Sequence, residues 1–304
     1  MLKHAKLVIL AILILIVAYY FDIARVGTTA YYLAGVFFGK EVRAEELLEK
    51  YKNGEVKILI VPGHDKKNYG AQYRGVTEAS LNAELGNYLF DSLRNNGKFS
   101  VFITNNSSGE RNDWILDYVK SQNTAIAAFK EKVKTIFKNA VKIGAVTKET
   151  KVFHNPAADN ISQILYGINK WANDNGMDIV LHIHFNDYPG RTYDMPGKYK
   201  GFAIYVPDNQ FPNGKASMEI AGFIKNELEK IVKESNFPGE KDVLIEDQQL
   251  IAVGSNASRE GVSLLIEYGY IYESKLLNKD LRPFVLRELA EATHRGLANF
   301  FKKY

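Results

Sequence analysis

The sequence predicts an α/β fold, with a mainly parallel twisted sheet covered by helices on both faces and a membrane anchor helix at the N-terminus. The first observation is a series of short, apolar, β-branched runs typical of buried strands, at 56–62, 99–104, 177–186, 201–206 and 262–271. The second is that amphipathic stretches separate them, at 78–95, 215–235 and 280–302. Strands that alternate with helices favour a parallel sheet with helices on both faces.

The third observation is an uncharged apolar run at residues 7–21, which lies behind two lysines and ahead of Asp22. It is shorter than the roughly 20 residues that span a bilayer comfortably, but the aromatic residues at its end extend it into the interface. Basic residues before the run place the N-terminus inside and the bulk of the chain outside. We therefore expect a single-pass protein of the cell membrane, with its folded domain on the extracytoplasmic side.

The first 25 residues are best interpreted as an uncleaved signal anchor. Small residues at the positions that signal peptidase reads are poor around Ala24 and only passable around Ala30, so a cleaved signal peptide is the less favoured alternative. Residues 26–54 follow as a juxtamembrane lead-in, and 55–304 form the single folded domain.

Composition limits the chemistry that this domain can use. The chain has 304 residues, of which 46% are hydrophobic, and a formal net charge of +4. That mild excess suits an anionic polymer or lipid surface and is not the signature of a nucleic-acid partner. There is no cysteine, so any metal site must use histidine and carboxylate ligands.

His64 and Glu78 are the first candidate ligands. Pro62 and Gly63 end the strand at 56–62, so His64 lies just beyond its carboxyl end, where open α/β sheets bind ligands. Glu78 follows Thr77, a good N-cap, and opens the helix at 78–95. Both can reach one metal ion, although a loop histidine and a glutamate that favours the helix N-terminus explain the same residues.

Two later strands carry further polar residues in apolar surroundings. His182 and His184 lie on one face of the strand at 177–186, because side chains alternate along a strand. Glu267 lies in the middle of the run at 262–271, where a carboxylate is costly unless a charged or hydrogen-bonding group receives it.

Four segments in order carry a specific resemblance: "PGHD…GAQYRGVTEASLN", "HIHFN", "GFAIYV" and "LLIEYGYI". Together they resemble the zinc-dependent N-acetylmuramoyl-L-alanine amidases of bacterial cell walls, over roughly 56–304 less one internal insert. Four motifs in register are specific, whereas any one alone is weak.

The resemblance implies that His64, Glu78 and His184 bind Zn²⁺ and leave a fourth position open. It also implies that Glu267 is the catalytic glutamate, which takes the proton of the attacking water and delivers it to the leaving nitrogen. His182 stands where the family usually has a small residue. A fourth ligand would close the site, so we expect His182 to be a buried neighbour that orients a ligand, and Asp65 to serve a similar purpose.

An insert at about 107–159 departs from the family. Its apolar residues recur at spacings of three and four, which predicts one or two amphipathic helices. The family's usual arginine-bearing connection is not found here. A helical decoration on the flank of the domain is the favoured interpretation, and the alternative is a lid that limits access to the zinc site or a docking site for a partner.

Residues near the ligands leave alternatives open. Gln72 and Arg74 either contact substrate or are solvated. Tyr268 and Tyr270 either line a groove or pack in the core.

The function predicted is zinc-dependent hydrolysis of the amide between N-acetylmuramic acid and L-alanine in peptidoglycan. One alternative is a zinc peptidase or other amidohydrolase that acts on a different amide; here the wide spacing of His64 and Glu78 argues against a zinc exopeptidase. Another is a non-catalytic wall-associated scaffold. The expected partners are peptidoglycan and the cytoplasmic membrane, and no protein partner is predicted.

Overall fold

A computed structural model describes residues 41–149, 154, 157–187, 190–192 and 194–303. Glu41–Tyr304 form one compact unit. The predicted anchor at 1–25 and residues 26–40 of the lead-in lie outside the described residues. Within the described part of the chain, no helix combines the length and the apolar composition that a membrane span requires.

The described residues build a six-stranded sheet in the order β4-β1-β5-β8-β6-β7. Strands β4, β1, β5 and β8 are mutually parallel, β6 runs antiparallel to β8, and β7 runs parallel to β6. The predicted mainly parallel sheet is therefore confirmed. The strands span Val56–Pro62 (β1), Phe99–Ile103 (β4), Ile179–Asn186 (β5), Ala203–Pro207 (β6), Leu244–Asp247 (β7) and Val262–Tyr270 (β8).

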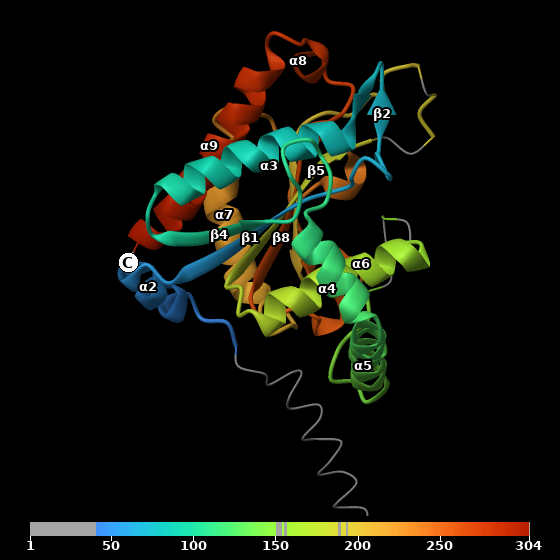
Figure 1. Ribbon diagram of the computed structural model, residues 1–304, viewed down its shortest axis with the longest axis vertical. Coiled ribbons are helices and arrows are strands. Elements are labelled where there is room, and N and C mark those ends of the chain that lie inside the picture. Colours follow the sequence, from blue (N-terminus) through green and yellow to red (C-terminus); the bar gives the residue numbers. More distant parts are fainter. Residues whose placement is uncertain (1–40, 150–153, 155–156, 188–189, 193, 304) are drawn as a thin grey trace, which may run out of the picture. The chain divides into compact units, whose positions relative to one another are not determined.

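Helices cover both faces of the sheet, as predicted (Figure 1). The α-helices span Ala44–Asn53 (α2), Glu78–Asn95 (α3), Asp113–Ser121 (α4), Asn123–Lys142 (α5), Asp159–Asp174 (α6), Gly214–Leu228 (α7), Ser274–Leu277 (α8) and Arg282–Lys302 (α9). Short 3-10 helices span Pro238–Glu240 (η1), Ile251–Val253 (η2) and Ser255–Ala257 (η3), and a small hairpin pairs Gln72–Tyr73 (β2) with Val76–Thr77 (β3).

Alternating side chains divide the core between the two faces of the sheet. Ile58 and Ile60 of β1 face α3, α7 and α9, where they belong to the largest buried apolar cluster. Leu59 and Val61 face the opposite way, onto Ile115 of α4 and the buried side chains of α6. This division places β1 and β5 in the middle of the domain, with their carboxyl ends held between two helical layers.

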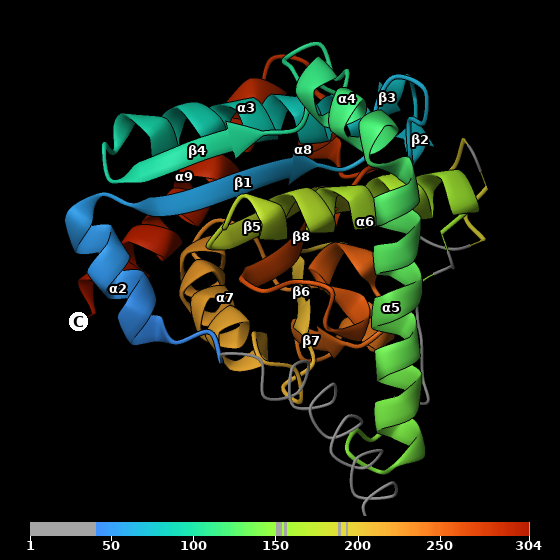
Figure 2. The ribbon, with the colours of Figure 1, turned by 60° about the horizontal axis from the view of Figure 1, so that its bottom comes forward.

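The insert forms α4 and α5, so the expectation of one or two amphipathic helices is confirmed. α4 packs on α6 through the buried apolar cluster that contains Leu59, Val61 and Ile115. α5 crosses α6, as Figure 2 shows. Ile126 and Val133 of α5 cluster with Tyr166 of α6. The insert is therefore built into the layer that covers the sheet.

The compact unit begins earlier than the boundary expected at residue 55. Leu47 and Leu48 of α2 are buried, and the ring of Tyr51 stacks on Phe301 with a centroid separation of 4.4 Å. Lys50 Nζ also lies 2.5 Å from Asp178 Oδ1. Part of the predicted lead-in is thus a structural element of the domain, because its apolar face packs against α9 and the sheet.

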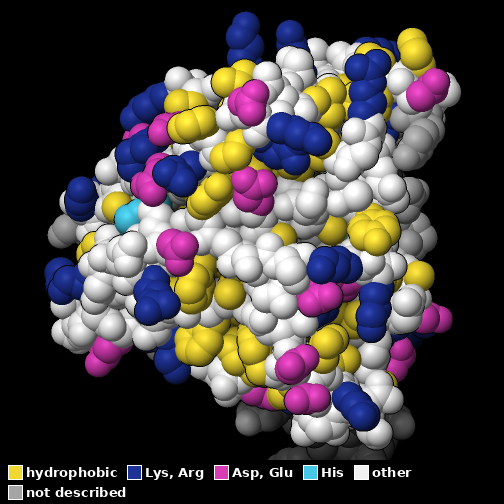
Figure 3. All heavy atoms as spheres, turned by 45° about the horizontal axis from the view of Figure 1, so that its top comes forward, with side chains coloured by type: hydrophobic (Ala, Val, Ile, Leu, Met, Phe, Trp, Pro, Cys, Tyr) yellow, Lys and Arg dark blue, Asp and Glu magenta, His cyan; other side chains and the backbone are white. Residues whose placement is uncertain are grey.

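One face of the molecule, seen in Figure 3, carries Lys and Arg side chains interspersed with Asp and Glu. The net positive charge of the chain is therefore not concentrated on that face.

Replacing Leu48 by alanine tests whether α2 is part of the domain. Removal of a buried leucine side chain costs about 2–5 kcal/mol through lost apolar burial and the cavity left behind. We expect the free energy of unfolding of residues 41–304 to fall by that amount in urea denaturation. The exposed neighbour Glu49 provides the control: Glu49→Ala should leave the unfolding midpoint nearly unchanged. Equal midpoints for the two variants would mean that α2 is not part of the cooperative unit.

Candidate metal centre

The candidate site residues meet because their strands are neighbours in the sheet. β5 lies between β1 and β8, and the register pairs Val61 with His182 and His184 with Glu267. The carboxyl ends of parallel strands meet at one edge, where open α/β sheets bind ligands. The structure therefore brings His64, His184 and Glu267 to a single edge, as expected from the sequence.

Glu78 joins the two histidines. Its Oε2 lies 3.2 Å from His64 Nε2, and its Oε1 lies 2.9 Å from His184 Nδ1. One potential ligand atom from each of the three residues lies within 4.8 Å of the other two. Two imidazoles and one carboxylate form a donor set that zinc binds in catalytic sites, where a fourth position stays open.

The start of α3 explains why a carboxylate can be buried at this point. The Thr77 side chain caps the helix by accepting from Ser80 N, and Glu78 stands in the first turn, where the helix dipole favours negative charge. Ala71 N donates to Glu78 Oε2 at 3.0 Å, in line with the ionised form. Burial alone would raise the pKa of Glu78, but its hydrogen bonds with His184 and His64 hold that pKa well below the usual range.

His64 has an unusual backbone conformation. Its φ of 64° is in the left-handed region, which costs a residue other than glycine about 1–3 kcal/mol. Asn105 Nδ2 donates to His64 O at 3.0 Å and helps to hold this turn. Burial lowers the pKa of the His64 imidazole, whereas its hydrogen bond with Glu78 raises it, and the net pKa is raised. Because zinc binds the neutral imidazole, this raised pKa makes metal binding at His64 more sensitive to pH.

Two glycines give the ligands room. A Cβ on Gly63 would lie 2.2 Å from His184 Cε1, so the His184 ring occupies the space that any side chain there would fill. A Cβ on Gly70, whose φ is +68°, would lie 2.4 Å from Glu78 Oε2 and 2.6 Å from His64 Cδ2. The backbone at these glycines thus lies close to the side chains of all three candidate ligands, as in a compact site for one metal ion.

Glu267 lies beside this cluster without belonging to it. Its Oε2 is buried and has no hydrogen-bond partner among the described residues. Burial raises the pKa of Glu267 well above its usual value, and the nearby charges of Glu78 and Glu240 raise it further. A carboxyl group that holds a proton readily, next to a metal cradle, is suited to proton transfer.

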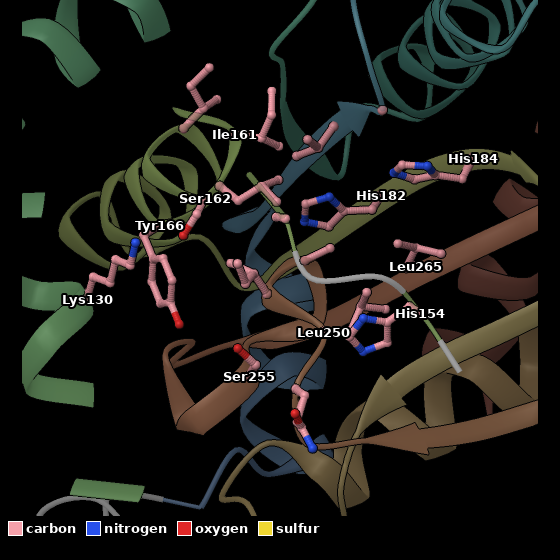
Figure 4. A pocket seen from close by; sticks show the side chains of 18 of the residues that line it. Lys130, His154, Ile161, Ser162, Tyr166, His182, His184, Leu250, Ser255 and Leu265 are labelled. Carbon is pink, nitrogen blue, oxygen red and sulfur yellow. The ribbon is translucent and has the colours of Figure 1, made fainter. Parts of the chain in front are cut away.

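His182 is buried, as predicted, and lies outside the three-donor cluster. Its Nε2 has no hydrogen-bond partner in the described structure. Burial lowers its pKa well below the usual value, and the neighbouring His184 adds to this effect, so His182 is neutral. Figure 4 shows His182 and His184 projecting from the same strand into a cavity.

Sequence reasoning missed several residues that support the site. Asn82 Nδ2 donates to Gly63 O at 2.8 Å and fastens α3 to the end of β1. Arg111, at the start of the insert, donates from Nε to Asp65 Oδ2 at 3.1 Å, so Asp65 anchors the loop that follows His64. Glu240 is fully buried and accepts from Asn186 Nδ2 at 2.7 Å, just beyond His184 on β5. The sequence holds little signal for these contacts, because they join residues from segments that are distant along the chain.

The alternatives for the neighbouring tyrosines are decided. Tyr268 and Tyr270 are fully buried, so the idea that they line a groove is wrong and they belong to the core. The Tyr268 hydroxyl contacts Thr293 Oγ1 at 2.8 Å, and the Tyr270 hydroxyl donates to Glu240 Oε2 at 3.2 Å. Gln72 and Arg74 are exposed, so their part in substrate binding stays a prediction.

A methyl group at Gly63 should disturb the centre directly. Gly63→Ala places a Cβ where the His184 ring lies, so we expect His184 to turn away and zinc occupancy to fall at least tenfold, in line with the loss of one ligand. The measurement is elemental analysis after dialysis against buffered zinc. Gly222→Ala is the matched control, because a Cβ at that position on α7 meets nothing within 4 Å. Full zinc content in Gly63→Ala would contradict the proposed position of His184.

Comparisons with known proteins identify the family of this chain. The profile of the Amidase_3 family, described as N-acetylmuramoyl-L-alanine amidase, matches residues 58–299. No curated protein matches the sequence.

Several solved structures share the fold at low sequence identity. The CwlD amidase from Clostridioides difficile, solved in complex with the GerS lipoprotein, superposes with a TM-score of 0.55 at 15% identity, over 82% of this chain and 100% of that one. An N-acetylmuramoyl-L-alanine amidase from Clostridium difficile 630 gives 0.52 at 14% identity, over 81% and 97%. Ami1 from Mycobacterium abscessus gives 0.50 at 14% identity, over 81% and 98%.

The family profile covers both the strands and the helix that carry the three donors and Glu267. The chain therefore belongs to the Amidase_3 family of N-acetylmuramoyl-L-alanine amidases, which are hydrolases of cell-wall peptidoglycan.

Proposed function

We propose that this protein hydrolyses the amide between N-acetylmuramic acid and L-alanine with one zinc ion held by His64, Glu78 and His184. The observation that carries the proposal is the convergence of two imidazoles and a carboxylate within 4.8 Å, at the sheet edge where Glu267 also stands, in a chain of this family.

Each ligand has a distinct part in holding the ion. Glu78 is kept ionised by the start of α3 and orients both imidazoles through its two oxygens. The missing side chain at Gly63 leaves the space that the His184 ring occupies. When bound, zinc supplies a Lewis acid that polarises the amide carbonyl and lowers the pKa of water to about 7.

Glu267 provides the proton transfer. It accepts a proton from the water that attacks the carbonyl carbon, and it returns that proton to the amine nitrogen as the C–N bond breaks. Its raised pKa makes the Glu267 carboxylate a stronger base for the first step. No covalent intermediate with the enzyme is needed, so the chain requires no cysteine or serine nucleophile.

The other predicted functions use the same residues differently. A zinc peptidase or another amidohydrolase would share the donor set and differ in the amide that it cuts. A wall-associated scaffold would not need a buried, partnerless carboxyl group beside the three donors. The family profile and the presence of all four residues favour the wall amidase.

We also propose that residues 1–25 anchor the protein in the cytoplasmic membrane with its catalytic domain outside. The support is the apolar run at 7–21 behind Lys3 and Lys6. Peptidoglycan lies on the extracytoplasmic side, so this orientation places the enzyme beside its substrate.

A digest of purified peptidoglycan with residues 41–304 and zinc tests the reaction. We expect new free amino termini on L-alanine with the glycan strands intact, and no new termini after chelation of the zinc.

Glu267→Gln should keep its zinc and lose about 10²–10⁴-fold in turnover, because an amide cannot accept the proton. If the new termini belong to another residue, the bond assignment is wrong; a loss below tenfold at equal zinc content would exclude Glu267 as the base.

Protease treatment of intact cells tests the topology. We expect the full-length protein to be degraded from the outside while a cytoplasmic marker survives, because the folded domain follows the predicted anchor. A domain that resists protease until the membrane is broken would contradict the proposed orientation.

A further inference from the structure

A cavity of about 780 Å³ extends from the metal centre beneath the helical insert. His64 and His184 line one end of it, and side chains of α5, α6 and the segment around η2 line the rest. Figure 4 shows Lys130 of α5 and Tyr166 of α6 across the cavity from the histidines of β5. The reacting amide would therefore lie at one end of a space large enough for several more residues of a substrate.

Among the described residues, three cationic side chains line this cavity: Arg111, Lys130 and Lys134. The acidic ones among them are Asp65 and Asp159, so in this described lining the positive charges outnumber the negative ones even before a metal ion binds.

Arg111 is built into the wall near the metal centre. Only 10% of its side chain is exposed, and its Nε is bound to Asp65. Its Nη1 is buried and has no hydrogen-bond partner in the described structure. A buried donor without an acceptor is costly, and a guanidinium matches a carboxylate with two parallel hydrogen bonds.

The lysines come from the insert. Lys130 and Lys134 are four residues apart, so they share a face of α5, and Ile126 and Val133 on that side pack the helix against its neighbours. Lys130 Nζ lies 3.5 Å from Asp159 Oδ1, but Asp159 is fully exposed, so solvent screens this pair. Within the described residues, Lys134 lines the cavity without an ion-pair partner.

We propose that this cavity binds the peptide part of the substrate, and that Arg111, Lys130 and Lys134 recognise its carboxylates. This inference rests on the proposed function, because the scissile amide joins a sugar acid to a peptide. The glycan side of that bond offers neutral hydroxyl and acetamido groups. The peptide side ends in a carboxylate and carries others wherever its side chains are acidic, and only that side matches the cationic wall.

The insert then has a role in substrate selection. α5 is held on α6 by its apolar face, while its lysines line the cavity. A purely structural pair of helices would not need these lysines at the cavity wall.

The test compares two soluble substrates: a muropeptide with free carboxylates and the same compound with its peptide carboxylates converted to amides. The variant is Lys130→Ala/Lys134→Ala, in which alanine preserves the helix. The control is Lys132→Ala/Lys138→Ala, which removes the same charge from exposed positions of α5 that do not line the cavity. Zinc content and thermal unfolding are checked for each protein.

We expect the ratio of kcat/KM for the free acid to that for the amide to fall about tenfold in the cavity variant, mainly through KM, because two charge contacts are lost. The control variant should keep the parent ratio. Equal ratios in the cavity and control variants would overturn the subsite.

Binding separates this inference from the proposed reaction. Calorimetry with the zinc-loaded Glu267→Gln protein measures affinity for the uncut free acid and for its amide. If the parent cuts neither compound at full zinc content, the proposed reaction fails, while tighter binding of the free acid still supports the subsite. If the parent cuts both compounds with equal kcat/KM, the reaction stands and the carboxylate subsite is wrong.

Discussion

The contact on which the rest of the site depends is the Glu78 carboxylate between two imidazoles. Its two oxygens contact His64, which follows β1, and His184 of β5, and Glu78 itself is the first residue of α3. One side chain therefore ties the end of β1, the end of β5 and the start of α3 to a common point. Burial of this charge is tolerable because the helix N-terminus, the Ala71 amide and both histidines stabilise it.

At this edge of the sheet, the pKa values of two carboxyl groups are shifted in opposite directions. Glu78 has a pKa held below its usual range, while burial and like charges raise the pKa of Glu267. Environments that separate the pKa values of two carboxyl groups assign them different roles, here a metal ligand and a proton carrier. His182 lies on the same face of β5 as His184, and because it is neutral it adds no charge that would shift the pKa of either carboxyl group.

Sequence reasoning predicted the bounds of an element best where apolar residues mark the strand or helix and a proline, glycine or capping residue marks its end. The predicted strand at 56–62 and helix at 78–95 have the observed bounds, because Pro62-Gly63 ends the one and Thr77 caps the other. The pairing of His184 with Glu267 depends on the strand order and register, which the sequence analysis did not predict. The bond of Arg111 to Asp65, the packing of α2 and the short strand β7 were not predicted, since each depends on contacts between segments far apart in the chain.

X-ray absorption at the zinc edge of the loaded protein tests the central claim most directly. The account predicts two imidazole ligands, with the remaining ligands being oxygen at about 2.0–2.2 Å, because His64, Glu78 and His184 hold the ion and solvent takes the open position. A third imidazole in the spectrum would contradict it, since His182 would then be a ligand and no open position would remain for the reaction.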